Sequence, residues 1–306
     1  MVEDHEADVA VSAVVRELME LPWSKAKELC RTGRVWVDGV QIFDPGQRLS
    51  AGAMVEVDRA APRHRLPALE DERIVHVDHD VIVVDKPAGL VTAAYEDEKD
   101  PDSDTLLART REALRQHEAA KGRRRDGIGV VQRLDKDTTG LLVFARTHTA
   151  RKHLQNQLRA HSMTREYLAL VHGTPNEGKI ESMLVPNRGD GRRGSWTRPG
   201  RPPREAKKAI THVVIRERLG AACLIACRLE TGRQHQIRIH LAEAGHPLLG
   251  DRIYSRGWRG RKLLAPRVML HAGTLGFRHP SNDRPVQFER PVPRDFEQVW
   301  HELRGG

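Results

Sequence analysis

The sequence predicts an α+β fold in which a small α/β module precedes a larger domain built on a mixed β-sheet. Apolar runs of strand length and amphipathic runs of helix length interleave along the chain, without the strict alternation that a doubly wound sheet requires. A proline- and arginine-rich stretch at residues 59–73 is typical of a linker. The sequence shows no internal repeat. We therefore expect a module at residues 9–58 and a main domain at residues 74–306.

The small module is expected to contain two helices and a small sheet. Residues 9–21 show the apolar spacing of a helix, which Pro22 ends. The segment SKAKELCRT predicts a second helix that Ser24 caps and Gly33 terminates. Alternating apolar residues around Asp38–Gly39 then predict a tight β-hairpin.

The main domain is expected to switch irregularly between strands and helices. One long strand is predicted over residues 74–89, and further strands over the segments TREYLALVHG and CLIACRLE. Helical spacing places Ala150, Leu154 and Leu158 on one face. The segment HQIRIHLAEAG predicts another helix, which Gly245 ends.

The composition is that of a globular protein with room for a full core. Of its 306 residues 39% are hydrophobic and 30% are charged, and no apolar run approaches the length of a membrane span. The first ten residues are acidic and polar, unlike a signal or transit peptide. The three cysteines have no C-x-x-C spacing, which is typical of a reduced compartment. We expect a cytoplasmic protein that does not enter a membrane.

Charge is distributed unevenly along the chain. Residues 1–58 carry 6 basic and 11 acidic residues, a net charge of −5, whereas residues 59–306 carry 45 and 31, a net charge of +14. Residues 96–104 predict an acidic surface loop, and residues 188–208, with eight basic and two acidic residues, predict a basic one. Arginine, which binds phosphates in a bidentate manner, supplies 40 of the 51 basic residues. The basic body favours a nucleic-acid partner, although an arginine-rich genome would equally explain the ratio of arginine to lysine.

Two motifs of other protein classes are present without their structural context. The segment GDGRRG matches the G-x-G-x-x-G pattern of dinucleotide sites, yet no strand is predicted before it and a proline-rich loop follows. His235, His240 and His246 lie near Cys227 in the sequence, but no pair among them has the spacing of zinc ligands. We therefore expect neither a dinucleotide cofactor nor a metal centre.

The segment GVVQRLDKDTTGLLVF, residues 129–144, places polar residues between two apolar runs. The first run, Ile128–Val131, predicts a central strand, and strand ends are where sheets usually present catalytic groups. Arg133 and Asp135 share one side of an extended chain, and Thr138–Gly140 can form a tight turn. A nucleophilic carboxylate must stay ionised, which a neighbouring arginine favours. The alternative is a surface ion pair of little energetic value.

Two other segments carry candidate polar groups. Arg238 lies in TGRQHQIRIHL, where the alternative is an ordinary solvent-facing helix arginine. Tyr167 lies in REYLALVHG and is one of three tyrosines in the chain. Its alternative is a core tyrosine with a hydrated hydroxyl, the commoner case.

Together these segments resemble the RluA family of RNA pseudouridine synthases. QRLDKDTTG is similar to the catalytic H-R-L-D-x-x-T-S-G motif of that family, with Gln132 in place of histidine and Thr139 in place of serine. The resemblance continues, in family order, through IVVDKPAGL, REYLALVHG, TGRQHQIRIHL, GHPLLGDRIYS and LHAGTLGF. The N-terminal segment SKAKELCRTGRVWVDG is similar to a small RNA-binding domain named after a ribosomal small-subunit protein.

The resemblance implies a mixed-sheet catalytic domain that needs no cofactor and no metal. It implies that Asp135 attacks a flipped-out uridine, that Tyr167 stacks on the uracil, and that Arg238 pairs with the carboxylate. Substrate-binding positions are then Arg133, which helps to fill the place of the extruded base, with Leu134, Thr138, Thr139, Gly140 and Arg233. From the local clusters of basic residues, the expected RNA-binding positions are Lys25, Lys27, Arg31, Arg34, Arg192, Arg193, Arg198 and Arg201.

The function expected from these features is isomerisation of uridine to pseudouridine in structured RNA, most simply large-subunit ribosomal RNA, by a monomeric enzyme. Transfer RNA is the alternative substrate within the same chemistry. A catalytically silent RNA-binding or ribosome-assembly factor is a second alternative, against which the presence of Asp135, Tyr167 and Arg238 argues. A DNA glycosylase shares base flipping, but the motifs give it little support.

Overall fold

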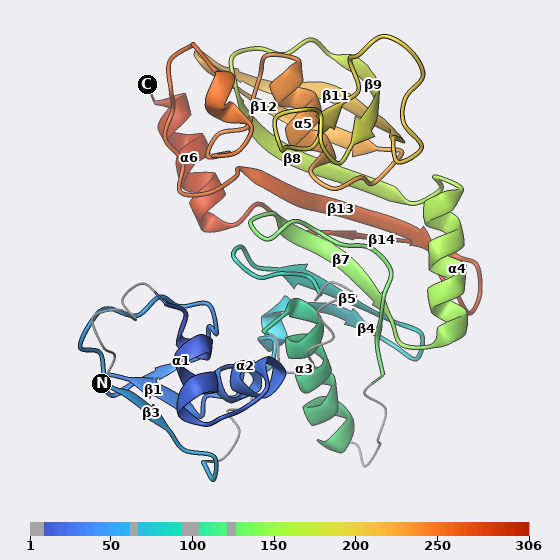
Figure 1. Cartoon of the computed structure of the whole chain (residues 1–306). Helices are drawn as coiled ribbons and strands as arrows, with labels where there is room; N and C mark the ends of the chain where they lie inside the picture. The colour runs from blue at the N-terminus through green and yellow to red at the C-terminus, as the bar shows by residue number, and fades with distance from the viewer. Residues whose placement is uncertain (1–8, 62–66, 94–103, 121–126, 306) are drawn as a thin grey trace. The chain divides into compact units, whose positions relative to one another are not determined.

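The computed structural model describes residues 9–61, 67–93, 104–120 and 127–305 of the chain (Figure 1). It divides into two compact units, the first comprising Met1–Ala68 with Ala94–Glu112, and the second comprising Leu69–Ala93 with Ala113–Gly306. The predicted acidic loop at 96–104 lies almost entirely outside the described residues. Among the described helices, none combines the length and the apolar character that a membrane crossing requires.

The first unit contains two short helices and a three-stranded antiparallel sheet in the order β2-β1-β3. Its elements are α1 (Val11–Leu18), α2 (Trp23–Arg31), β1 (Val35–Val37), β2 (Val40–Ile42) and β3 (Val55–Val57). The predicted hairpin is confirmed: Val37 pairs with Val40, and both Asp38 and Gly39 have positive φ, as a two-residue turn demands.

The predicted Ser24 cap is wrong, whereas the predicted end of that helix is confirmed. Pro22 occupies the N-cap position of α2 in an extended conformation, so Ser24 falls inside the first turn. Proline suits a helix start because its fixed φ is compatible and its missing N–H would have no helical partner there. At the other end Gly33 follows the C-cap with φ 66°.

The second unit is built on an eleven-stranded mixed sheet. Its strands run in the order β10-β9-β11-β12-β8-β13-β7-β5-β4, with β14 paired to β13 and β6 paired to β7. The β13–β7 pair is parallel, whereas the other pairs are antiparallel. The strands are β4 (Ile74–Val77), β5 (Val81–Lys86), β6 (Gly129–Val130), β7 (Thr139–Ala145), β8 (Thr164–His172), β9 (Gly178–Val185), β10 (Gly194–Ser195), β11 (Lys207–Leu219), β12 (Ala222–Leu229), β13 (Leu270–Arg278) and β14 (Pro285–Glu289). The expected α+β class is confirmed.

Helices cover parts of this sheet and bury its apolar side chains. The helices are α4 (His148–Arg159), α5 (Gln236–Glu243) and α6 (Arg294–Arg304), and the boundary between the units falls within α3 (Leu106–Ala120). Two short 3₁₀ turns lie at Asp71–Arg73 and Ser255–Gly257. Leu154 of α4, the helix at the right of Figure 1, packs against Val143 and Leu275. Phe296 of α6 packs against Leu170. Burial of each such side chain contributes about 1.5–3 kcal/mol.

Two strand predictions are corrected by the structure. Residues 74–89 form a hairpin of β4 and β5 rather than one strand, because Asp78 Oδ1 accepts hydrogen bonds from the N–H groups of Asp80 and Val81 and turns the chain. The run Ile128–Val131 contributes only the two residues of β6, which pair with β7 alone. The buried strand at this point is therefore β7, which follows the polar segment.

Candidate active site

The loop that carries Asp135 is tied down on its N-terminal side by Thr92. The Thr92 hydroxyl donates to the carbonyl of Leu134 at 2.8 Å, and the N–H of Leu134 donates back to the same hydroxyl at 3.1 Å. After Asp135, the N–H of Thr138 donates to the Asp135 carbonyl at 3.1 Å and closes a turn. The Asp135 side chain keeps 22% of its surface exposed. It is therefore accessible to solvent while its backbone is held in place.

The other end of the loop passes directly into β7. Gly140 has φ 110°, and a Cβ at this position would lie 2.3 Å from the carbonyl oxygen of Ala272 on the neighbouring β13. The Thr139 hydroxyl lies 3.0 Å from His271 Nδ1, also on β13. Leu134, Thr138, Thr139 and Gly140 are all buried. In the structure these four predicted substrate residues support the loop that presents Asp135.

Lys86 anchors the same loop through hydrogen bonds, a role that the sequence motifs did not reveal. Its side chain is fully buried at the end of β5. Its Nζ donates to the carbonyls of Pro87, Leu90 and Lys136 at 2.7–2.8 Å. Burial lowers the pKa of Lys86 to about 7, while the carboxylates of Asp137 and Asp135 oppose that shift. A single side chain thus joins the segment after β5 to the residue next to Asp135.

Arg238 faces Asp135 from α5 and is itself held by a second carboxylate. Its Nη1 lies 3.6 Å from Asp135 Oδ2. Its Nε and Nη2 donate to the two oxygens of Asp251 at 2.7 and 3.1 Å, a bidentate pair in which both side chains are buried. Burial lowers the pKa of Arg238, but Asp251 and Asp135 outweigh it and raise the pKa above its usual value. The guanidinium is therefore a fixed positive charge beside Asp135.

Asp251 was missed by the sequence interpretation. It follows the segment GHPLLG and lies thirteen residues from Arg238, so only the fold brings the two together. Burial raises the pKa of Asp251, but the hydrogen bonds and charge of Arg238 outweigh that effect and lower the pKa below its usual range. The signal for Asp251 was its place in GHPLLGDRIYS, one of the segments that resemble the family, because a carboxylate in such a segment is a candidate partner for a buried arginine.

Tyr167 lies on β8, between Cys227 of β12 and Ala272 of β13, and only 7% of its surface is exposed. Burial raises the pKa of its phenol, Arg165 lowers it, and the negative charge of Asp135 raises it again. The phenol therefore stays protonated and lies within the electrostatic reach of Asp135. Of the three side chains that the sequence singled out, Asp135 and Arg238 thus lie side by side, while Tyr167 is paired with Ala272, the β13 residue that also pairs with Gly140 at the end of the Asp135 loop.

The family assignment rests on comparison as well as geometry. A model of the RNA pseudouridylate synthase family matches residues 80–243, which include all three of these side chains. The chain belongs to the RNA pseudouridylate synthase family. It is accordingly an RNA pseudouridine synthase, as the sequence motifs predicted.

Relatives of this synthase are similar over nearly its whole length. It is 34% identical to a protein of Zymomonas mobilis named ribosomal large subunit pseudouridine synthase D, over 97% of this chain and 93% of the relative. It is also 34% identical to a protein of the same name from Xanthomonas campestris, over 99% of this chain and 92% of the relative. The solved structure of human RNA pseudouridylate synthase domain containing 4, at 22% identity, has the same fold, with a TM-score of 0.61 over 76% of this chain and 93% of the human one.

The two remaining arginines predicted to bind substrate are exposed on loops of the synthase. Arg133 lies two residues before Asp135. Arg233 donates from Nε to the carbonyl of Lys208 at 2.9 Å, and its N–H donates to Gln236 Oε1 at 3.0 Å. These contacts attach the start of α5 to β11. Contact of either arginine with RNA stays a prediction.

The predicted RNA-binding residues occupy different settings in the two units. In the first unit Lys25 forms an ion pair with Glu28 at 2.8 Å, and Arg34 donates to the carbonyl of Ala61. In the second unit Arg192 donates to the carbonyl of Ile253, and Arg198 lies over the ring of Trp196. The other predicted positions are Lys27 and Arg201, which are exposed, and Arg31 and Arg193, which are partly exposed.

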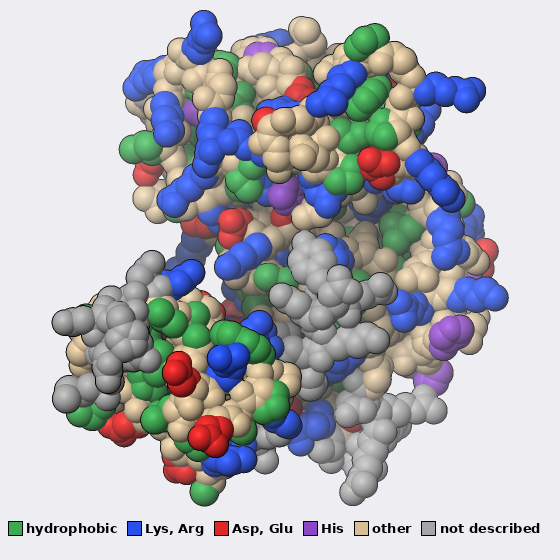
Figure 2. Space-filling view, in the orientation of Figure 1, with side chains coloured by type: hydrophobic (Ala, Val, Ile, Leu, Met, Phe, Trp, Pro, Cys, Tyr) green, Lys and Arg blue, Asp and Glu red, His purple; other side chains and the backbone are tan. Residues whose placement is uncertain are grey.

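A further basic segment in the second unit was not predicted. Residues 252–262 contain five basic and no acidic residues, and the basic side chains are all exposed: Arg252, Arg256, Arg259, Arg261 and Lys262. Figure 2 shows many Lys and Arg side chains over the part of the molecule that holds β8–β12. The segment directly follows Asp251, the partner of Arg238. A count of charges in a sliding window would have found it.

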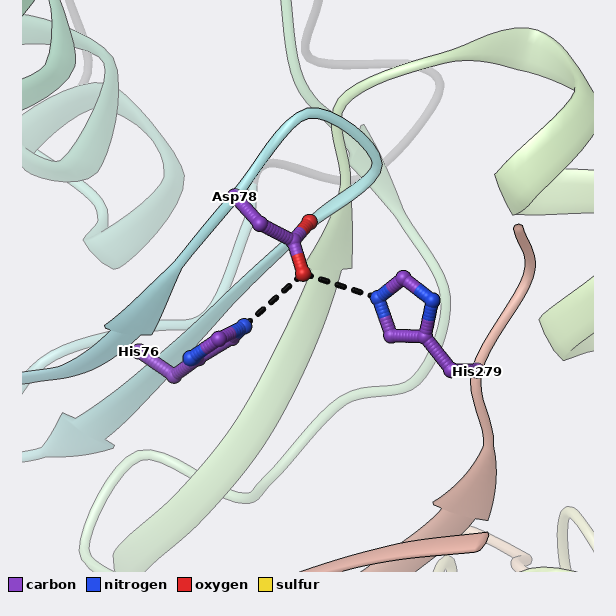
Figure 3. A group of neighbouring side chains, drawn as sticks. All are labelled: His76, Asp78 and His279. Atoms are coloured by element: carbon purple, nitrogen blue, oxygen red, sulfur yellow. Dashed lines mark hydrogen bonds and ion pairs between the residues drawn. The ribbon is translucent and has the colours of Figure 1, made fainter. Parts of the chain in front are cut away.

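His76, Asp78 and His279 form a second polar group, at the turn between β4 and β5 (Figure 3). Both histidines approach Asp78 Oδ2 through Nε2 at 2.8 Å. The N–H of Ser281 donates to His279 Nδ1, so the ring proton of neutral His279 lies on Nε2 and points at Asp78. A metal ligand would need the opposite tautomer. The group is explained as a hydrogen-bonded clamp between the β4–β5 turn and the segment after β13.

Proposed function

We propose that this synthase converts uridine to pseudouridine in large-subunit ribosomal RNA, with Asp135 as the nucleophile. The observation that carries the assignment is the pairing of the partly exposed Asp135 carboxylate with Arg238, at 3.6 Å between Oδ2 and Nη1, while Asp251 fixes the guanidinium. The names of the relatives from Zymomonas mobilis and Xanthomonas campestris support the ribosomal substrate. Transfer RNA is the alternative.

The reaction is an isomerisation and needs no co-reactant. The bond between N1 of the uracil and C1′ of the ribose breaks, and a bond between C5 and C1′ forms. The proton on C5 is lost, and N1 of the reattached base carries one instead. Such chemistry requires the nucleotide to leave its stack, which costs a few kcal/mol. We assign the attack to Asp135 because Arg238 keeps a carboxylate ionised at a partly buried position.

The neighbouring side chains receive supporting roles in this proposal. Tyr167 stacks on the target uracil and, being held protonated by its burial, orders the base through its ring and hydroxyl. Arg133, exposed beside Asp135, helps to fill the place that the extruded base leaves. Arg233 binds a flanking phosphate. Leu134, Thr138, Thr139 and Gly140 shape the loop.

RNA is held over a wider surface of basic residues. We propose that the arginines of the 188–208 loop and the basic residues of 252–262 bind the phosphates near Asp135, because both segments are basic and their basic side chains are exposed or partly exposed. Lys25, Lys27, Arg31 and Arg34 give the module at residues 9–58 a separate RNA-binding face, joined by the linker at 59–73 to a catalytic domain at 74–306. The protein acts as a monomer in the cytoplasm, without metal or cofactor.

Substitution of Asp135 tests the catalytic assignment. Asp135→Asn keeps the shape of the side chain but removes the negative charge, so pseudouridine formation should fall by about 10⁴-fold or more while RNA affinity stays within about twofold. The matched control is Asp137→Asn, the same change two residues away on an exposed side chain of the same loop. Single-turnover assays should find the control near wild type. An Asp135→Asn variant that turns over at the wild-type rate would refute the assignment.

A further inference from the structure

His235 has an unusual backbone conformation directly beside the proposed nucleophile. It is the residue before α5, with φ 58° and ψ 17°, in the left-handed region that residues with a Cβ rarely adopt. Its side chain makes no capping hydrogen bond to the helix, although the cap position favours residues that do. Strain of this kind persists where the surrounding structure enforces it, and it concentrates at functional sites.

The left-handed turn aims the imidazole at Asp135. His235 Nε2 lies 4.0 Å from Asp135 Oδ1. The other carboxylate oxygen, Oδ2, faces Arg238 Nη1 at 3.6 Å. Each oxygen of the proposed nucleophile thus faces a different nitrogen donor, and the two donors come from the start of α5 and from its first turn.

Tyr254 sets the orientation of the imidazole from the opposite side. Its hydroxyl lies 2.9 Å from His235 Nδ1, and its ring lies 5.3 Å from the guanidinium carbon of Arg238. Burial raises the pKa of Tyr254 to about 12, so the hydroxyl keeps its proton and can donate it to Nδ1. With Nδ1 accepting, the ring proton of neutral His235 lies on Nε2, on the side of Asp135.

Burial of the imidazole favours its neutral form. Burial lowers the pKa of His235, and Arg238 and Arg193 lower it further, while Asp135 and Asp251 raise it. The net shift is downward, so His235 is a neutral hydrogen-bond donor at neutral pH. A neutral imidazole can hold the Asp135 carboxylate by a hydrogen bond without cancelling its negative charge. This suits a carboxylate that must remain nucleophilic.

We propose that His235 is a positioning residue for the reaction, which holds Oδ1 of Asp135 through Nε2–H while Arg238 holds Oδ2, with Tyr254 fixing the imidazole tautomer. The inference rests on the proposed catalytic role of Asp135. In the free protein the Nε2–Oδ1 distance is longer than a hydrogen bond, and catalytic contacts commonly tighten when the substrate enters. The two donors together leave the carboxylate one orientation towards the ribose.

The test is His235→Gly, because glycine adopts the left-handed backbone without strain. Thermal unfolding should occur at the wild-type temperature or above it. The turnover number should fall by about tenfold to a hundredfold, with RNA affinity within about twofold, since only the orientation of Asp135 is lost. Added imidazole should restore part of the lost turnover, because the missing group is partly exposed to solvent. Imidazole should not affect the wild type.

Tyr254→Phe is the second variant. It keeps the ring beside Arg238 and removes only the hydroxyl that orients His235, so turnover should fall, and imidazole should not restore it. The inference is overturned if His235→Gly turns over at the wild-type rate. It is also overturned if the variant loses RNA affinity by as large a factor as it loses turnover and added imidazole restores neither. Asp135→Asn separates this failure from failure of the proposed function, since that variant must be inactive whatever His235 does.

Discussion

At the scale of single residues, the site depends on pairs that are distant in the sequence. The positions of Asp135, Tyr167 and Arg238 could be singled out from local motifs, because each stands in a short segment with its own pattern. Their partners could not. Asp251 lies thirteen residues from Arg238, and Lys86 lies fifty residues from the carbonyl of Lys136 that it binds. Such pairings depend on strand order, which the sequence pattern does not specify.

Lys86 makes the stability of the protein depend on pH. Its pKa is about 7 in the folded protein and 10.5 when unperturbed. Between these values unfolding takes up a proton, so the free energy of unfolding should rise with pH, by at most about 1.4 kcal/mol per pH unit from this group. Below pH 7 both states are protonated and the contribution is constant. Lys86→Met should remove this rise.

Urea denaturation of wild type and Lys86→Met at pH 6, 7.5 and 9 measures the effect. The informative quantity is the difference between the two proteins in free energy of unfolding, since all other titrating groups are shared. That difference should move in favour of the wild type as the pH increases. A difference that is the same at all three pH values would show that Lys86 keeps its proton, held by its three carbonyl acceptors.

At the scale of secondary-structure elements, local turn chemistry decided what could be predicted. The Asp38–Gly39 hairpin was predictable because the turn itself requires positive φ at both positions. The β4–β5 hairpin was missed because its turn contains neither glycine nor proline. There the Asp78 side chain replaces them by accepting two backbone N–H groups, and His76 and His279 hold its other oxygen. The sequence VDHD carries no marker that distinguishes this turn from a continuous strand.

The close approach of β7 and β13 at Gly140 gives a prediction at this scale. Gly140→Ala should lower the free energy of unfolding by at least about 3 kcal/mol, because the new Cβ meets the backbone of Ala272 in addition to an unfavourable φ of 110°. Gly178→Ala is the matched control, since Gly178 has φ 126° but open space around its Cβ position. The control should lose only about 1–2 kcal/mol.

Denaturant titration of both glycine variants compares clash and strain directly. Equal losses at the two positions would mean that β13 moves away from Gly140 at little cost. The loop carrying Asp135 would then tolerate displacement, contrary to the tight packing described for its C-terminal end. A larger loss at Gly140, accompanied by reduced turnover, would show that the strand contact also positions the proposed nucleophile.

At the scale of the whole molecule, the sequence predicted the α+β class and the enzyme family, and the structure and the relatives confirm both. The charge asymmetry was equally visible in the sequence, with a net charge of −5 on residues 1–58 and +14 on the rest. What the sequence pattern left out was which basic residues share a surface. The exposed segment 252–262 follows Asp251 directly, so the partner of Arg238 is continuous in sequence with a basic segment.

The most direct test of the account is the identity of the modified nucleotide. Purified protein should be incubated with unmodified transcripts of large-subunit ribosomal RNA and of transfer RNA, and pseudouridine should be mapped in each by chemical labelling, with Asp135→Asn as the blank. We predict pseudouridine at one or a few defined uridines of the large-subunit RNA, and none in the blank. Pseudouridine in the transfer RNA alone would contradict the proposed substrate, and its absence from both transcripts and from intact ribosomal particles would contradict the proposed function.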